Sequence, residues 1–335
     1  MKNSEKFLKF KKSSKTGKAP GFFYKNSHYP LGKGVKELEI ITNISKMQKI
    51  SWPLLRNGET VGLVPTMGYL HEGHISLIKR ARKNTAKVIT SIFVNPIQFG
   101  PKEDYANYPR DMERDTEMAK KAGTDYIFVP GAKDMYPMDF ATFAEVKEMD
   151  SIMCGAFRPG HFRGVCTVVL KLFNIIHPSM AYFGLKDYQQ YLIIKKMSAE
   201  LNLQVKIIGC PIIREKDGLA MSSRNKYLTE KERSGATVLY RSLKFAKVKI
   251  IGGERDLLKL QKSCINNIKN DENVSKIDYF DFRDSTTLKE IKSLEPAEGI
   301  KEPKKLLVAT AVHIGRTRLI DNIVINIKNM QKSVD

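Results

Sequence analysis

The chain has 335 residues, of which 42% are hydrophobic and 28% charged, a composition typical of globular proteins. Because this length exceeds what one hydrophobic core usually supports, we expect a large domain and a smaller one. No apolar run approaches the roughly 20 residues of a membrane-spanning helix, which excludes an integral membrane protein of that kind. The net charge is +21, with ten lysines in residues 1–36, and the remaining excess is spread out rather than gathered into the basic face that nucleic-acid binding predicts.

Residues 1–36 are expected to form a basic, poorly ordered extension, because lysine, serine and glycine dominate and little apolar surface offsets the chain entropy. Acid-poor leaders can be organelle transit peptides, but this one lacks arginine and an apolar signal core, so a solvated tail is favoured and organellar targeting stays the alternative. The four cysteines form no CxxC pair, which favours a reducing compartment, here the cytoplasm.

Helical and strand patterns alternate from residue 37 to residue 224. We expect helices at residues 37–50, 75–83, 108–122, 164–176 and 188–201, and strands at residues 60–67, 87–95, 125–130, 180–187 and 203–213. Such alternation predicts strands that lie parallel with helices on both faces. This part is therefore expected to be a doubly wound, Rossmann-like α/β domain.

Residues 225–335 are expected to form a smaller α/β domain that acts as a lid. The patterns predict helices near residues 230–246 and 254–269 and strands at residues 276–282 and 306–311. The prolines and charges of residues 293–305 indicate an exposed turn.

Ligands of doubly wound sheets bind at the carboxyl ends of strands, near the point where the strand order reverses. The segment TVGLVPTMGYLHEGH, residues 60–74, puts Gly68 in such a strand-to-helix turn and His71 and His74 near the start of the next helix. Residues three apart on a helix can face the same way. A helix start favours phosphate oxygens, and imidazole donors stabilise charge that builds up on a leaving pyrophosphate.

The histidine pair allows two other interpretations. Helical metal pairs usually use the spacing of HExxH together with a third ligand, and no partner cluster is visible among the remaining histidines. Two surface histidines without a role are the second alternative. The absence of a Walker GxxxxGK[ST] motif removes the commonest other ATP cradle.

The segment PTMGYLHEGH resembles the HIGH-type signature of the nucleotidylyltransferase superfamily, in the form found in pantothenate synthetases. Four more segments agree in the same order, and a weaker match extends the resemblance toward the carboxyl end. They are SIFVNPIQF at residues 91–99, RPGHFRGV at 158–165, GLKDYQQ at 184–190, REKDGLAMSSRNKYL at 214–228 and, more weakly, GRTRLIDN at 315–322.

The resemblance implies an ATP-dependent ligase that joins pantoate to β-alanine through an enzyme-bound pantoyl adenylate and releases AMP and pyrophosphate. It also implies Mg²⁺ on the triphosphate and only small molecules as substrates. Members of this family are commonly homodimers, so the resemblance implies that assembly too.

Site residues carry over from the matching motifs. The resemblance implies catalytic roles for His71, His74, Lys186 and Arg224. It implies ATP contacts at Met67, Gly68, Tyr69, Leu70, His71, Glu72, Gly73, His74, Gly184, Leu185, Lys186, Asp187, Ile213, Met221, Ser222, Ser223 and Arg224. It assigns Gln98 and Gln190 to pantoate, with Gln98 also near β-alanine.

The residues themselves support several of these roles. Asn95 and Gln98 follow a buried strand, and amides that point into a cleft suit the hydroxyls of pantoate. Lys186 can meet phosphate, and Asp187 can bind ribose hydroxyls or orient Mg²⁺. The MSSR segment that ends at Arg224 resembles the mobile KMSKS loop of related enzymes, whose hydroxyls and guanidinium suit a triphosphate.

Some points stay open at the level of sequence. Leu185 stands where the family commonly has glutamate, a change that a backbone contact tolerates and a required carboxylate does not. The polar residues Arg158, His161 and Arg163 can bind a carboxylate or phosphate, or can tie a loop to its neighbours. The rival functions are an adenylyltransferase with another acceptor and a nonenzymatic basic scaffold that binds RNA or a partner.

Overall fold

The computed structural model describes residues 38–101, 103–295 and 304–327. These described residues cluster as one compact unit. The predicted extension at residues 1–36 and most of the predicted turn at residues 293–305 lie outside the described residues. Within them, no helix is both long enough and apolar enough to cross a membrane.

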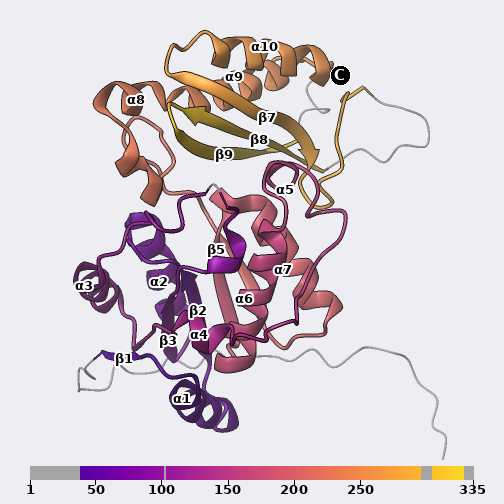
Figure 1. Cartoon of the computed structure of the whole chain (residues 1–335). Coiled ribbons are helices and arrows are strands. Elements are labelled where there is room, and N and C mark those ends of the chain that lie inside the picture. Colours follow the sequence, from indigo (N-terminus) through magenta and orange to yellow (C-terminus); the bar gives the residue numbers. More distant parts are fainter. Residues whose placement is uncertain (1–37, 102, 296–303, 328–335) are drawn as a thin grey trace, which may run out of the picture. The chain divides into compact units, whose positions relative to one another are not determined.

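A parallel sheet of six strands forms the centre of the first part of the chain (Figure 1). Its strands are β1 (Glu39–Ile41), β2 (Val61–Thr66), β3 (Lys87–Ile92), β4 (Tyr126–Phe128), β5 (Met180–Gly184) and β6 (Lys206–Cys210). The order β1-β4-β3-β2-β5-β6 reverses direction between β2 and β5. The expected doubly wound, Rossmann-like sheet is therefore confirmed, and its ligand edge is predicted where β2 and β5 end.

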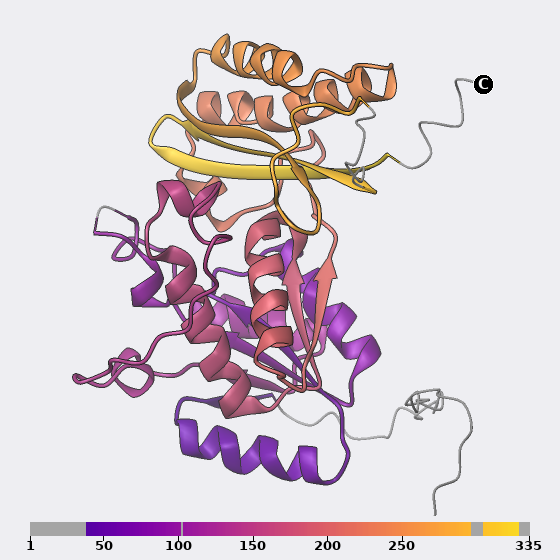
Figure 2. The same cartoon turned by 90° about the vertical axis from the view of Figure 1, so that its right-hand side faces the viewer.

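Helices cover both faces of this sheet, as Figures 1 and 2 show. One face packs against α1 (Ile44–Arg56), α6 (His161–Ile176) and α7 (Tyr188–Glu200), and the other against α2 (Glu72–Asn84) and α3 (Met112–Ala122). Strand β2 shows the alternation that two buried faces require, because Leu63 belongs to the first core and Val64 to the second. Short helical turns complete the connections: η1 (Pro96–Gln98), α4 (Ala132–Met135), α5 (Cys154–Phe157), η2 (Leu185–Asp187) and η3 (Ser223–Tyr227).

The prediction of one helix over residues 37–50 was wrong at its start. Residues Glu39–Ile41 form β1, an edge strand that pairs in parallel with β4. The helix begins only at Ile44, where the Asn43 side chain accepts a hydrogen bond of 2.9 Å from the Lys46 N–H. A strand of three residues is too short to show an alternating pattern, so only its pairing with β4 identifies it.

An antiparallel sheet of three strands forms the smaller second part. It consists of β7 (Val274–Asp284), β8 (Lys305–Ile314) and β9 (Thr317–Asn326), in that order, with α8 (Glu230–Gly235), α9 (Val238–Ile251) and α10 (Leu257–Lys269). Leu306 and Val308 of β8 pack in one core with α9 and α10, whereas Leu307 and Ala309 join the core that contains α6 and α7. The expected smaller α/β part is confirmed. Strand β9 was not predicted, and the helix predicted at residues 230–246 is interrupted after Gly235, where α8 ends and α9 follows.

Helix α6 approaches η1 closely at Gly164. A Cβ atom at this position would lie 2.4 Å from the Ile97 carbonyl oxygen and 2.7 Å from the backbone of Gln98. No side chain fits at such distances, so glycine is required for the contact. This contact matters because η1 carries the predicted substrate residues.

We expect Gly164→Ala to lower the free energy of unfolding by roughly 1–3 kcal/mol, because the added methyl forces α6 and η1 apart. Gly184→Ala is the matched control, since its Cβ would meet nothing within 4 Å and its φ of −73° suits alanine. Urea unfolding of both variants measures the difference. Equal stabilities would contradict the steric role of Gly164.

Candidate functional site

A cavity of about 220 Å³ opens where β2 and β5 end. It brings together predicted site residues from four of the five motifs, namely Met67, His71, Gly73, His74, Asn95, Gln98, Gly184, Lys186, Asp187, Gln190, Ile213, Met221, Ser222, Ser223 and Arg224. The third motif contributes only Val165 to the lining, and its candidates Arg158, His161 and Arg163 are not among the lining residues. A larger cavity of about 690 Å³ adjoins it. The two share Lys186, Asp187, Gln190, Ser222 and Arg224.

The loop between β2 and α2 is fixed through its backbone N–H groups. Thr66 Oγ1 donates to the Ser91 carbonyl at 2.8 Å and accepts from the Gly68 N–H at 3.2 Å. The following residue, Tyr69, has a φ of 51°, in the left-handed region that a non-glycine residue adopts only when its surroundings impose it. The loop is therefore held in one conformation by specific partners.

Asp115 of α3 is the main partner of this loop, and the sequence analysis missed it. Its carboxylate accepts hydrogen bonds from the Tyr69 N–H at 2.6 Å and the Leu70 N–H at 2.7 Å, and only 1% of the residue is exposed. Asp115 shares the buried face of α3 with Ala119 and Ala122. A carboxylate on the apolar face of an amphipathic helix was the signal that could have identified it.

The two histidines cap the start of α2 as neutral rings. His71 Nδ1 accepts from the Gly73 N–H at 3.1 Å, and His74 Nδ1 accepts from the His71 N–H at 3.3 Å. A nitrogen that accepts from a backbone N–H carries no proton, so the proton of each neutral ring sits on Nε2. Both rings thus have one N–H left to donate, and their centroids lie 4.1 Å apart.

Burial and nearby positive charge keep these rings neutral. Burial, and then the charge of Lys186, lowers the pKa of His71 from 6.5 to about 4. Burial, followed by the neighbouring His71 and Lys186, lowers the pKa of His74 well below its usual value. At neutral pH the positive charge beside the histidines therefore comes from Lys186 rather than from the imidazoles.

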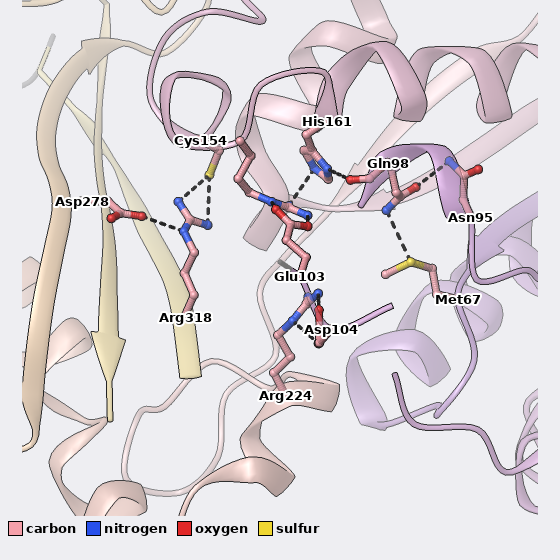
Figure 3. Close-up of polar contacts among 11 residues, drawn as sticks. Met67, Asn95, Gln98, Glu103, Asp104, Cys154, His161, Arg224, Asp278 and Arg318 are labelled. Carbon is pink, nitrogen blue, oxygen red and sulfur yellow. Dashed lines mark hydrogen bonds and ion pairs between the residues drawn. The ribbon is translucent and has the colours of Figure 1, made fainter. Parts of the chain in front are cut away.

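The predicted substrate amides form a hydrogen-bonded pair (Figure 3). Asn95 Nδ2 donates to Gln98 Oε1 at 3.0 Å and to the Gly164 carbonyl at 3.1 Å. The Gln98 amide nitrogen is directed toward Met67 Sδ, 3.4 Å away. Both amides line the smaller cavity, together with the histidines and Gln190.

Two arginines of the site are paired with neighbouring carboxylates of one loop, and Figure 3 labels the pair of Arg224 and Asp104. Arg224 makes two bonds to Asp104, at 3.0 and 2.8 Å, and Arg158 is bonded to Glu103 at 2.7 Å. His161 Nδ1 lies 2.9 Å from the Gln98 carbonyl. Arg158 and His161 therefore connect loops, which is one of the two interpretations of the third motif given above. The third candidate of that motif, Arg163, lies over the Phe143 ring.

The fifth motif lines the same cavity as the histidines. The Met221 N–H donates to the Ile213 carbonyl at 3.0 Å, so these two predicted ATP contacts are neighbours. Ser222 caps η3 through the Arg224 N–H, and the Ser223 hydroxyl lies 2.9 Å from the Tyr108 hydroxyl. Of the two hydroxyls, that of Ser223 already has a side-chain partner.

Five predicted ATP contacts are not among the residues that line the smaller cavity. Leu70 lies in the core, Glu72 is exposed, and the Tyr69 ring lies beneath Lys226. Gly68 adjoins Ile92 and Asp115, and the Leu185 side chain packs beside Gly209. Their contacts with ATP stay predictions.

Strand β9 holds the connection between β5 and α7. Asn322 Nδ2 donates to the carbonyls of Leu185 and Lys186, both at 2.9 Å, and the neighbouring Asp321 pairs with Arg214 at 2.6 and 2.8 Å. Asn322 and Asp321 belong to the weakest of the recognised motifs, which received no role at the level of sequence. The second part of the chain therefore supports the backbone that carries Lys186.

The larger cavity is lined by strands of the antiparallel sheet, including Arg318 of β9, and by loops and helices of the first part of the chain. The Arg318 guanidinium bonds to Asp278 at 2.8 Å and lies 3.7 Å from Cys154 Sγ (Figure 3). Among the described residues, no group of three or more histidine, cysteine or acidic side chains is arranged to hold a metal ion.

Removal of the Asp115 carboxylate should loosen the loop between β2 and α2. We expect Asp115→Ala to lose roughly 2–4 kcal/mol of stability, because two buried N–H groups lose their acceptor, and to accelerate amide hydrogen exchange at Tyr69 and Leu70. Asp125→Ala is the control, since Asp125 accepts from Arg82 and the Val88 N–H at the other end of the sheet. Exchange at residues 69 and 70 that is equally fast in both variants would contradict the assignment.

Replacement of His71 should change how stability depends on pH. Because the folded-state pKa of His71 is about 4, against 6.5 for the free side chain, its contribution is complete above pH 6.5 and is lost as the pH falls toward 4. His71→Asn keeps an N-cap acceptor but no titrating ring. Between pH 7 and pH 5, the free energy of unfolding should therefore fall less in the variant than in the wild type; parallel urea-derived profiles would refute this.

Comparisons with known proteins identify the relatives of this chain. The family model described as pantoate-beta-alanine ligase matches residues 39–324. The pantothenate synthetases of Caldicellulosiruptor saccharolyticus and Geobacter sulfurreducens are 53% and 51% identical over 288 residues, 86% of this chain and 99% of each relative. The crystal structure of the Thermus thermophilus pantothenate synthetase matches with a TM-score of 0.78 and 38% identity, covering 85% of this chain and 98% of that one.

A second solved relative carries ligands. The Francisella tularensis pantoate-beta-alanine ligase, in complex with β-γ ATP and β-alanine, matches with a TM-score of 0.68 and 35% identity, covering 86% of this chain and 98% of that one. The resemblance drawn from the motifs is therefore confirmed. With a family model that spans most of the chain and relatives that match over nearly their whole length, the chain belongs to the pantoate-beta-alanine ligase family.

Proposed function

We propose that this protein joins pantoate to β-alanine at the expense of ATP, forming pantothenate, AMP and pyrophosphate through an enzyme-bound pantoyl adenylate. The observation that carries the proposal is the convergence of two neutral imidazole donors, a lysine and a pair of amides on one cavity. Donors of both kinds suit a triphosphate, and the amides suit a small hydroxy acid. Family membership supplies the reaction that connects the two ligands.

In the first step the pantoate carboxylate attacks the α-phosphate of ATP and the bond to pyrophosphate breaks. Negative charge grows on the departing oxygen. The Nε2–H groups of His71 and His74 can donate to phosphate oxygens without giving up their protons, because both rings are neutral. Lys186 adds a full positive charge next to them, so this side of the cavity is arranged to stabilise the transition state.

Pantoate is proposed to bind against Gln98, Gln190 and Asn95. Its hydroxyls and carboxylate offer donors and acceptors that amides can match. A buried amide left without a partner is costly, so a site of this kind rejects acids that lack the hydroxyls. The proposed position of pantoate is therefore the amide-lined side of the smaller cavity.

In the second step the amine of β-alanine attacks the carbonyl carbon of the mixed anhydride, the amide bond forms and AMP leaves. Residue Gln98 is proposed to lie near this amine. The proposed β-alanine route is the adjoining larger cavity, which shares Gln190 and Arg224 with the smaller one. Exclusion of water here protects the adenylate from hydrolysis, and the small domain, with its boundary proposed near residue 224, is proposed to act as the lid.

Arg224 is proposed to bind the triphosphate. Its guanidinium is paired with Asp104, so phosphate oxygens must share or replace that carboxylate. Ser222 of the same motif lines both cavities. Contacts that form only as the loop reaches the phosphates favour the transition state over free ATP.

Mg²⁺ fits the site as an ion bound mainly by the triphosphate. Asp187, an exposed carboxylate that lines both cavities, is the residue proposed to hold it, in keeping with the preference of this ion for phosphates and one or two carboxylates. When bound, the ion would neutralise part of the phosphate charge. A homodimer in the cytoplasm remains the proposed setting, which sedimentation and fractionation would test.

Pyrophosphate exchange tests the proposed intermediate. With ATP, Mg²⁺ and pantoate but no β-alanine, labelled pyrophosphate should enter ATP, because the adenylate forms reversibly before the amine is needed. AMP and pantothenate should accumulate only when β-alanine is added, as mass spectrometry would show. Exchange that requires β-alanine would exclude a separate adenylate, and a stable nucleotide conjugate would indicate an adenylyltransferase.

A matched pair of lysine variants locates this chemistry. Lys186→Ala should slow the exchange by about 100-fold or more, the usual cost of removing a group that stabilises transition-state charge. Lys196→Ala removes an exposed lysine that pairs with Glu200 on α7 and should leave the exchange rate unchanged. Comparable rates in the two variants would defeat the assignment of Lys186.

A further inference from the structure

The direction of the hydrogen bonds around Gln98 is set by one backbone carbonyl. The Gly164 oxygen can only accept, and it lies 3.1 Å from the Asn95 amide, so the Asn95 NH₂ group must face it. The same NH₂ group lies 3.0 Å from the Gln98 side chain. Gln98 must therefore turn its oxygen toward Asn95, which leaves its own NH₂ group on the side of Met67 and the cavity.

Tyr136 completes this chain from the other end. Because the Asn95 NH₂ group is committed to Gly164 and Gln98, the Asn95 oxygen faces the opposite way, and the Tyr136 hydroxyl donates to it at 2.7 Å. Burial raises the pKa of the Tyr136 hydroxyl, so it keeps its proton. Every bond from Tyr136 through Asn95 to Gln98 then runs in one direction.

Tyr136 itself stands behind the site. It is not among the residues that line the smaller cavity, whereas Asn95 and Gln98 are. Its ring packs edge-on against Phe140, with centroids 5.0 Å apart, and lies 6.2 Å from the Phe93 ring. The hydroxyl is thus held in position by aromatic packing, and removing it alone leaves that packing in place.

We infer that Tyr136 is a positioning residue for substrate recognition: through Asn95 it holds the Gln98 amide with its NH₂ group toward the bound hydroxy acid, so that this position donates to a substrate oxygen. The inference rests on the proposed function for the identity of that acid. It adds a residue that lines neither of the two cavities. It also assigns Gln98 a donor role, where the amide type alone allows either a donor or an acceptor.

Tyr136→Phe tests the inference by steady-state kinetics. Losing one buried hydrogen bond should raise KM for pantoate about tenfold, while KM for ATP stays close to the wild-type value, because the histidines and Lys186 are untouched. The preference for pantoate over an analogue without one hydroxyl should fall as well. Tyr182→Phe is the control, since Tyr182 is fully buried and its hydroxyl faces Met180 Sδ, outside both cavities.

A direct measurement separates this inference from the proposed function. In ¹⁵N-labelled protein, the side-chain NH₂ signal of Gln98, identified by its loss in Gln98→Glu, should shift in Tyr136→Phe and not in Tyr182→Phe. An unchanged signal or an unchanged KM for pantoate overturns the inference even if the wild type makes pantothenate. A wild type that makes none, while the signal shifts as expected, overturns the proposed function and leaves the orienting role of Tyr136 supported.

Discussion

The pairing of β2 with β5 is the constraint on which the site depends. These strands pair through Gly62 with Met180 and Leu63 with Ala181, in their first halves. Their second halves end at Pro65 and Thr66 and at Phe183 and Gly184, which line the smaller cavity. Because the strand order reverses at this pair, the connection from β2 to α2 and the connection from β5 to α7 lead to opposite faces of the sheet. The space between these two connections stays open to a ligand.

Much of the fold was readable in the sequence because parallel strands buried on both faces carry continuous apolar runs. The apolar runs predicted both β2 and β3, although the predicted strands at residues 60–67 and 87–95 extend past the observed ends at Thr66 and Ile92. The position of the histidines followed from the first run. The strands of the small second part were harder to predict from the sequence. Strand β9 mixes charged and apolar residues over its length, with Arg318 and Asp321 among the charged ones. These charged residues are explained only by their tertiary partners, because Arg318 pairs with Asp278 and Asp321 pairs with Arg214.

The positioning residues could not be predicted in the same way. Asp115 follows the loop it holds by more than 40 residues, and Tyr136 reaches Asn95 across a similar separation. Neither residue has a distinctive local motif, since an aspartate on a helix and a tyrosine before a proline are ordinary. Their roles come from tertiary contacts with backbone N–H groups and an amide, which local patterns do not encode. The edge strand β1 was missed for the related reason that its pairing partner, not its three residues, defines it.

The hydrogen bonds of Asn322 tie the two sheets together at one point of the backbone. A single side-chain amide on β9 holds two successive carbonyls just before α7, and the second belongs to Lys186. A rotation of the antiparallel sheet would either break both bonds, together with the neighbouring pair of Arg214 and Asp321, or pull the lysine's backbone along with it. The backbone of Lys186 therefore links the two sheets mechanically. A movement of the antiparallel sheet that keeps these bonds intact also displaces Lys186, at the place where the phosphates are expected to bind.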